Sequence, residues 1–225
     1  MNLYIVATPI GNLKDISLRA LEVLKEADLI LCEDTRVTKR LLNHYNIRTS
    51  TLSYHQHSRL QRVNSIIQLL KSSKNLALVS DAGTPGISDP GNELVKTVIE
   101  LLSDQVKVIP IPGSSAVIAA ASISGLSMDK FLFLGFPPKK KKRRKFFEEV
   151  VKSKYPVIFY ESPYRIIKTL KELQSTLGNQ QLTIVVCREL TKKFETTYRG
   201  DIEEVIEKIK KDKIKGEFTI IVKKK

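Results

Sequence analysis

The sequence predicts an α/β fold with two α/β domains and mainly parallel sheets. Short apolar runs, typical of buried strands, alternate with longer segments whose apolar residues have helical spacing, along all 225 residues. Such alternation is typical of parallel sheets that are covered by helices on both faces. A change in composition at Ser124–Lys130 (SGLSMDK) indicates a linker, which predicts domains at residues 1–126 and 128–225.

In the first half, each expected strand is an apolar run bounded by polar or turn-forming residues. The expected strands are Leu3–Ala7, Asp28–Cys32, Thr51–Ser53, Leu76–Val79 and Val106–Ile109. The first helix is expected to follow a cap at Asp15 or Ser17 and to end at Glu26, with leucines along one face. The other expected helices are about Val37–Tyr45, a segment with Val63, Ile66, Ile67 and Leu70 at helical spacing, Asn92–Leu102, and an alanine-rich helix that ends at Ser122.

The second half continues the alternation of strand and helix without a detectable internal repeat. The expected strands are Phe131–Leu134, Pro156–Tyr160, Leu182–Cys187 and Glu217–Val222. The expected helices are Tyr164 to about Leu177, and Asp201–Lys211. Both halves are therefore expected to place helices against a sheet.

The formal net charge of +14 and the isoelectric point near 9.7 favour a polyanionic partner such as nucleic acid over an anionic membrane surface. No apolar stretch approaches the roughly 18–20 residues that span a bilayer, and the start of the chain lacks the basic segment of a signal peptide. Cys32 and Cys187 lie in apolar runs and are expected to be buried free thiols, as in the reducing cytoplasm. No metal site is expected, because no cysteine pair has zinc-ligand spacing, and His55 and His57 are interpreted as a solvated pair.

The most informative stretch is Leu76–Gly91, LALVSDAGTPGISDPG. A short buried strand is followed by a loop rich in glycine, proline and aspartate, and open α/β sheets bind ligands at the carboxyl ends of their strands. The glycine spacing matches neither the dinucleotide fingerprint nor the triphosphate-binding loop. The loop is therefore either a long turn without a ligand or a site for a smaller ligand held mostly by backbone groups.

Six expected strands end in polar or turn-rich clusters. These clusters are Thr8–Asn12, Glu33–Arg36, residues 80–91, Pro112–Ser115, Tyr160–Pro163 and Cys187–Leu190. Because the carboxyl ends of parallel strands share one edge, the clusters are expected to line one cleft at the junction of the domains.

Several of these residues have two possible roles. Ser114 and Ser115 can cap a helix, contact a ligand, or do both. Glu33, Asp34 and Arg36 can form an internal ion pair, or they can hold substrate and accept a proton. The basic run KKKKRRK at Lys139–Lys145 can be a solvated face, but the net charge favours contact with phosphates.

The motifs as a set closely resemble one family. They are LYIVATPIGNLKDIS, CEDTR, LVSDAGTPGISDPG, PGSSA, FLFLGFPP, FYESPYR and CREL-TK, in this order. Over essentially the whole chain they are similar to the ribosomal small-subunit RNA ribose-2′-O-methyltransferase I family, in the tetrapyrrole-methylase-like superfamily of S-adenosylmethionine-dependent enzymes. The resemblance implies two α/β domains of the class III methyltransferase type, with the cofactor in the cleft between them. It also implies a homodimer and methylation of a cytidine ribose in the decoding region of small-subunit ribosomal RNA.

The resemblance also implies which residues bind the cofactor. They are Pro9, Ile10, Asp81, Ala82, Gly83, Ile87, Ser114, Ser115, Ala116, Tyr160, Cys187 and Leu190, and less firmly Phe218. The tetrapyrrole methylases carry a glycine-rich first loop and a compact G-D-P motif, where this chain has TPIGNLKD and DAGTPG. These departures leave the cofactor register open and weigh against a tetrapyrrole substrate.

For catalysis we hypothesise that Glu33 or Asp34 assists deprotonation of the ribose hydroxyl while Arg36 holds a phosphate or the cofactor carboxylate. The reserve candidates are Glu161, Arg165 and Glu189. A methylase of a small acidic tetrapyrrole and a non-catalytic RNA-binding module are the alternative functions.

Overall fold

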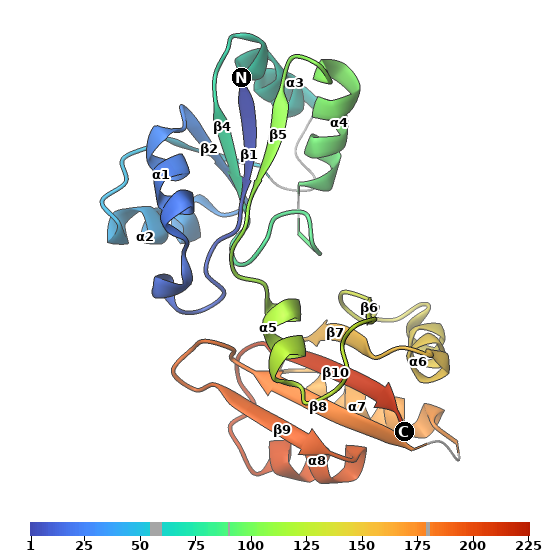
Figure 1. Ribbon diagram of the computed structural model, residues 1–225. Coiled ribbons are helices and arrows are strands. Elements are labelled where there is room, and N and C mark those ends of the chain that lie inside the picture. The colour runs from blue at the N-terminus through green and yellow to red at the C-terminus, as the bar shows by residue number, and fades with distance from the viewer. Residues whose placement is uncertain (55–59, 90, 179–180) are drawn as a thin grey trace. The chain divides into compact units, whose positions relative to one another are not determined.

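The computed structural model describes residues 1–54, 60–89, 91–178 and 181–225. These residues form two compact units, Met1–Ser115 and Ala116–Lys225, and each unit has its own sheet (Figure 1). The division comes earlier than the expected linker, because the alanine-rich helix α5 (Ala116–Ile123) packs on strands of the second unit. The expected histidine pair, His55 and His57, and the loop residue Pro90 lie outside the described residues.

The sheet of the first unit is parallel throughout, as the sequence predicts. Its strand order is β3-β2-β4-β1-β5. The strands are β1 (Asn2–Val6), β2 (Leu29–Cys32), β3 (Thr51–Ser53), β4 (Leu76–Val79) and β5 (Lys107–Ile111). All four residues of β4 are buried, which explains why this central strand has a continuous apolar sequence.

Helices cover both faces of this sheet (Figure 1). On one face lie α1 (Leu18–Glu26) and α2 (Thr35–His44), and on the other lie α3 (Leu60–Lys71) and α4 (Asn92–Leu102). Alternate side chains of β4 serve the two faces: Ala77 and Val79 pack with α1 and α2, whereas Leu76 and Leu78 pack with α3 and α4. The first unit is therefore a three-layer structure whose strands all end at the same edge.

The cap of α1 is Ser17, one of the two residues that the sequence proposed. Its side chain accepts a hydrogen bond from the backbone N–H of Ala20 at 3.1 Å. Asp15 instead belongs to a short 3₁₀ helix, η1 (Leu13–Asp15).

The second sheet differs from the expectation of mainly parallel strands. Its order is β6-β7-β10-β8-β9. The strands are β6 (Leu132–Phe133), β7 (Val157–Glu161), β8 (Leu182–Arg188), β9 (Thr196–Gly200) and β10 (Phe218–Lys224). Only the β6–β7 pair is parallel among the paired strands described, since β10 is antiparallel to both β7 and β8, and β9 is antiparallel to β8.

The reason for the difference is the position of the last strand. β7 and β8 run in the same direction and are connected by helix α7 (Ile166–Thr176), as strand–helix alternation predicts. They are not neighbours, however, because β10 lies between them and runs the opposite way. The α/β class is confirmed, and the parallel arrangement is confirmed for the first sheet only.

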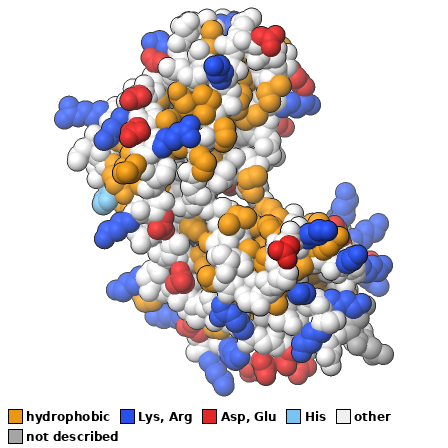
Figure 2. Space-filling view, viewed as in Figure 1, with side chains coloured by type: hydrophobic (Ala, Val, Ile, Leu, Met, Phe, Trp, Pro, Cys, Tyr) orange, Lys and Arg blue, Asp and Glu red, His pale blue; other side chains and the backbone are white. Residues whose placement is uncertain are grey.

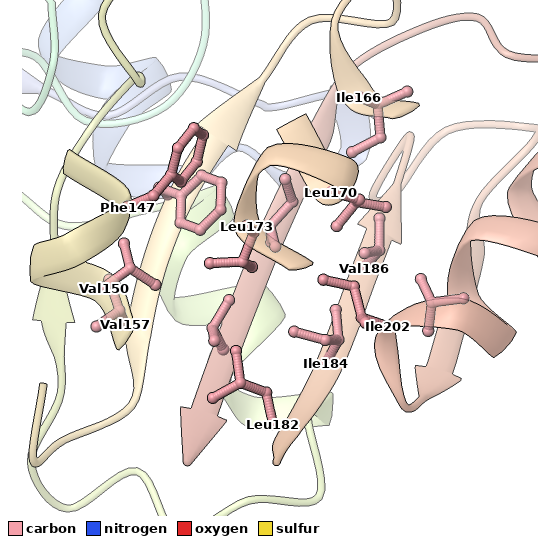
Figure 3. Packing of buried hydrophobic residues seen from close by; sticks show 14 of the residues in the cluster. Phe147, Val150, Val157, Ile166, Leu170, Leu173, Leu182, Ile184, Val186 and Ile202 are labelled. Carbon is pink, nitrogen blue, oxygen red and sulfur yellow. The ribbon is translucent and has the colours of Figure 1, made fainter. Parts of the chain in front are cut away.

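A single core lies between the second sheet and three helices, α6 (Arg143–Lys152), α7 and α8 (Ile202–Lys210). Figure 3 shows Leu170 of α7 beside Val186 of β8, and Phe147 farther along the same core beside Val150. Helix α5 packs on the opposite face, against β10 and β7. The sequence interpretation missed two of these elements, α6 and β9.

Within the part of the chain that the structure describes, every helix is too short or too polar to cross a lipid bilayer.

Candidate functional site

The loop after β4 is fastened to the segment after β1. The backbone N–H of Thr8 donates to the carbonyl of Gly83 at 2.9 Å, and the N–H of Gly83 donates back to the carbonyl of Thr8 at 3.0 Å. The Thr8 hydroxyl also donates to the carbonyl of Ser80 at 3.2 Å. Because Thr8 and Ser80 are both buried, these bonds fix the start of the loop at the edge of the sheet.

The same loop meets the segment after β5. Gly83 has a φ of +82°, and a side chain at this position would lie 3.5 Å from Cγ2 of Ile10 and 3.8 Å from the carbonyl of Ser114. The Thr84 hydroxyl donates to that same Ser114 carbonyl at 3.2 Å. The structure thus brings together Ile10, Gly83 and Ser114, three residues that the family resemblance assigns to the cofactor.

The segment after β2 completes this edge. The backbone N–H of Asp34 donates to Oδ1 of Asp81 at 3.0 Å. Asp34 is also the N-cap of α2, where its carboxylate accepts from the backbone N–H of Arg36 at 2.8 Å and pairs with the Arg36 guanidinium at 2.6 Å. The hydrogen bond from the Arg36 side chain lowers the pKa of Asp34 to about 2. The internal ion pair that the sequence left open is therefore present.

Asp89, at the far end of the loop, is a group that the sequence interpretation did not single out. Burial raises the pKa of its carboxyl to about 6, and the negative charges of Glu33 and Asp81 raise it further. A hydrogen bond with Ser80 lowers the pKa but does not outweigh these effects. Burial at one loop position cannot be seen in the sequence, where Asp89 is one of two aspartates in the loop. A carboxyl group with a pKa near neutrality is the kind of group that enzymes use to accept a proton.

A pocket of about 240 Å³ opens at this edge. Its lining residues are Thr8, Pro9, Leu13, Val37, Thr38, Arg40, Leu41, Ser80 and Asp81. The Thr38 hydroxyl is buried and makes no hydrogen bond to a nitrogen or oxygen atom of the described residues, and the neighbouring Cys32 thiol is a weak hydrogen-bonding group. A buried hydroxyl without a strong partner in the wall of a pocket can bind a polar group of a ligand.

In the second unit, the predicted residues Tyr160 and Cys187 share one row of the sheet. Thr219 of β10 pairs with Tyr160 on one side and with Cys187 on the other. Paired residues of neighbouring strands point to the same face, which is the face that α5 covers, beginning with Ala116. The sequence interpretation named Phe218 rather than Thr219, but Phe218 is in the core on the opposite face.

Leu190 follows β8 in a tight turn. Glu189 and Thr191 on either side of it have φ values of +52° and +64°, and Lys192 pairs with Glu189 at 2.9 Å. Leu190 itself is 8% exposed. This turn places a buried Leu190 just after the carboxyl end of β8.

The other predicted residues are more exposed or lie farther from these hydrogen bonds. Ile87 is 49% exposed, Ala82 is an exposed loop residue, and Ser115 is half-buried just before α5. Among the reserve candidates, Glu161 is buried and forms an ion pair with Arg165 at 2.7 Å. Within the described residues no group of three or more His, Cys, Asp and Glu side chains has an arrangement that could hold a metal ion.

Comparisons with known proteins agree with this architecture. The family model described as Tetrapyrrole (Corrin/Porphyrin) Methylases matches residues 2–206. A solved cobalt precorrin-4 methyltransferase is similar with a TM-score of 0.70 at 18% identity, over 98% of this chain and 94% of that one. A solved uroporphyrin III C-methyltransferase from Thermus thermophilus has a TM-score of 0.64 at 18% identity, over 99% of this chain and 97% of that one. The fold and the segments gathered at the sheet edges define a methyltransferase of the tetrapyrrole methylase class.

More similar sequences narrow the family. The protein named ribosomal RNA small subunit methyltransferase I in Halalkalibacterium halodurans is 49% identical over 98% of this chain and 75% of its own length. The protein of the same name in a Synechocystis strain is 46% identical over 98% of this chain and 78% of its own length. The chain belongs to the ribosomal RNA small subunit methyltransferase I family, as the motifs predict. It is a methyltransferase, and its methyl donor is S-adenosylmethionine.

Proposed function

We propose that this chain methylates the 2′-oxygen of a cytidine ribose in the decoding region of small-subunit ribosomal RNA, with S-adenosylmethionine as the donor. The observation that supports the proposal is the edge of the first sheet, in a chain of this family. Hydrogen bonds hold the segments after four strands together there, and three of these segments line a pocket with a buried hydroxyl whose partner among the described residues is a thiol. The net charge of +14 supports a polyanionic substrate.

The residues of this edge fit S-adenosylmethionine. Pro9 and Leu41 offer apolar walls, and Thr38 offers a hydroxyl with only a weak thiol partner among the described residues. The carboxylate of Asp81 suits the cationic groups of the cofactor, while Arg40 suits its carboxylate. When bound, the cofactor supplies an electrophilic methyl group on a sulfonium centre. The chain itself has to align the ribose oxygen with that methyl group and exclude water.

The remaining cofactor positions are part of the same proposal. They are Ile10, Ala82, Gly83, Ile87, Ser114, Ser115, Ala116, Tyr160, Cys187 and Leu190. Residues of both units would thus bind one donor molecule. The proposal also includes a homodimer, a cytoplasmic location and the ribosome as the place of action.

The ribose hydroxyl loses its proton as its oxygen gains the methyl group, and a base of the chain can accept that proton. Glu33, Asp34 and Arg36 are the residues proposed from the sequence for catalysis. Of the two acids, Asp34 is poorly suited to take the proton, because its cap and its ion pair with Arg36 stabilise the charged form. We therefore propose Asp89 as the proton acceptor, whose affinity for a proton is raised by its burial and, to a smaller extent, by the charge of Glu33.

The test is methyl transfer from labelled S-adenosylmethionine to small ribosomal subunits and to naked ribosomal RNA that lack the modification. The modified nucleoside is then mapped. We expect label in one 2′-O-methylcytidine of the decoding region. Label in a tetrapyrrole but not in RNA, or RNA binding without binding of the donor, would replace the proposal with one of the two alternative functions.

A further inference from the structure

The basic segment Lys139–Lys145 contains two kinds of residue. Arg143 is only 7% exposed, whereas the other six side chains of the segment are exposed. Figure 2 shows Lys and Arg side chains gathered on the part of the second unit where Figure 1 places α6. A uniform solvated face would have no reason to bury one of its cations.

Arg143 is held by three groups. Its guanidinium donates to the Glu172 carboxylate at 2.6 Å, to the Thr169 hydroxyl at 2.6 Å and to the carbonyl of Pro138 at 3.1 Å. The first two partners belong to α7, and the third immediately precedes the lysines. Arg143 therefore fastens the start of the basic segment to a packed helix.

A buried carboxylate completes this anchor. Glu161 at the end of β7 accepts from the Thr169 hydroxyl at 2.6 Å and pairs with Arg165 at 2.7 Å. Arg165 in turn donates to the carbonyl of Pro137 at 3.3 Å. Two arginines thus hold two successive backbone carbonyls, so the lysines that follow start from a fixed point rather than from a loose loop.

The lysines are unfavourable for the helix that they precede. Helix α6 begins at Arg143, its N-cap Lys142 makes no side-chain cap, and no acidic residue lies in its first turn. Positive charge at the N-terminus of a helix opposes the helix dipole. Among the described residues, Lys139–Lys142 also form no ion pair, whereas Arg144 pairs with Glu148 at 2.9 Å. Neither the helix nor a neighbouring acid of the described residues stabilises these four positive charges. This indicates that they bind an external anion.

We propose that Lys139–Lys142 bind phosphates of the RNA substrate, and that Arg143 and Glu161 are positioning residues for this surface. The choice of RNA over another polyanionic surface rests on the proposed function. Consecutive lysines at a fixed point can neutralise neighbouring phosphates of a strand and release their counterions, which makes binding dependent on salt.

The test compares two charge-matched triple variants. One carries Lys140→Gln, Lys141→Gln and Lys142→Gln, and the control carries Lys223→Gln, Lys224→Gln and Lys225→Gln at the end of β10, beside the start of β7. The affinity for a small-subunit RNA fragment is measured at several salt concentrations, together with the affinity for S-adenosylmethionine. For the first variant we expect RNA binding weaker by about 10-fold to 100-fold and a slope of log K against log salt that is smaller by about 2. Equal RNA slopes for the two variants would overturn the proposal.

Two further measurements separate the roles. Arg143→Lys keeps the charge but loses the forked geometry, so we expect KM for RNA to rise about 10-fold while kcat and donor affinity stay the same. An unchanged KM in a folded Arg143→Lys variant would contradict the positioning role.

Binding of the triple lysine variants to anionic vesicles is measured in parallel. Loss of vesicle binding with an unchanged RNA slope would assign the surface to membranes instead. RNA binding that depends on the lysines, without any methyl transfer, would uphold the surface and refute the proposed function.

Discussion

Two carboxyl groups at the same sheet edge have opposite proton affinities. Asp34 is an exposed helix cap whose pKa the Arg36 side chain lowers to about 2. Burial and neighbouring acids raise the pKa of Asp89 to about 6. The environment therefore makes the same type of side chain a permanent anion in one place and a group that titrates near neutral pH in the other.

The variant Asp89→Asn should separate stability from activity. The folded pKa of about 6 lies above the ordinary value of 3.8, so between these values the folded chain holds a proton that the unfolded chain has released. Stability therefore rises as pH falls through this window, and the ionised carboxyl destabilises the fold at pH 7. We expect Asp89→Asn to raise the free energy of unfolding at pH 7 by about 1 kcal/mol, a value reduced because the carboxyl is partly exposed.

The same variant should lose methyl transfer by roughly 10²-fold to 10⁴-fold, since it has no base for the ribose proton. In the unaltered protein the rate should fall as pH drops below about 6, where Asp89 becomes protonated. Single-turnover rates across pH measure both effects, with the exposed Asp104→Asn as the control. Asp89→Asn with the parent's rate and pH profile would exclude Asp89 as the base and return the role to Glu33.

Gly216 is a position where two constraints act together. Its φ is +90°, and an added Cβ would collide with the carboxylate of Glu189, whose partner Lys192 stabilises the turn at Leu190. Gly125 has a similar φ of +75° but nothing within 4 Å, so it isolates the backbone effect. In urea unfolding we expect Gly125→Ala to cost about 1 kcal/mol and Gly216→Ala clearly more, with weaker donor binding for Gly216→Ala only. Equal losses for the two variants would show that Glu189 moves aside freely.

At the scale of the helix and strand, the basic segment shows how burial changes the contribution of an arginine to the free energy of unfolding. Arg143→Met removes the nearest cation from Glu172 and one of the two cations of the buried Glu161, which keeps Arg165. We therefore expect a loss of about 2–3 kcal/mol in the free energy of unfolding, less than for a buried charge left wholly unpaired. Arg144→Met, one residue away and exposed, should change it by less than about 0.5 kcal/mol. Denaturant unfolding of both variants gives the comparison, and similar values for the two would mean that the network contributes little.

The elements that sequence patterns predict well are those with a continuous apolar run or a clear helical face. Four strands of the first sheet (β1, β2, β4 and β5) fall into this group, as do helices α1, α4 and α8, whereas β3 was predicted although only Leu52 of its three residues is apolar. Helix α6 was missed because its first residues belong to the basic run, although Phe146, Phe147, Val150 and Val151 have helical spacing and are buried. Strand β9 was missed because only Tyr198 of its five residues is buried, so its apolar signal is weak.

The residues of the site also divide into those that sequence patterns can indicate and those that they cannot. Residues in turn-rich clusters after parallel strands, such as Ile10, Gly83 and Ser114, could be brought together from the sequence, because parallel strands end at one edge. The sequence could not indicate that Thr219 and Asp89 lie at the site. The first depends on β10 lying between β7 and β8, and the second depends on burial of one loop carboxyl, and neither is a local property of the sequence.

For the molecule as a whole, the proposal that both units bind one donor has a direct test. A saturating donor at about 100 times its Kd should stabilise the fold by about 2.7 kcal/mol. We expect amide exchange to slow both at the Thr8–Gly83 bridge in the first unit and at Cys187–Leu190 in the second. Slower exchange in only one unit would contradict a donor site shared by the two.

The position of β10 also bears on how the chain folds during its synthesis. The first unit is complete once Ser115 has been made, and its strands pair with partners from the same stretch of sequence. In the second unit, β7 and β8 must wait for the strand that separates them, which is made about sixty and forty residues later. During this delay their inner edges are open to mispairing with each other or with another chain. A nascent chain that stalls between β9 and β10 should therefore carry one protease-resistant half and one half that depends on chaperones.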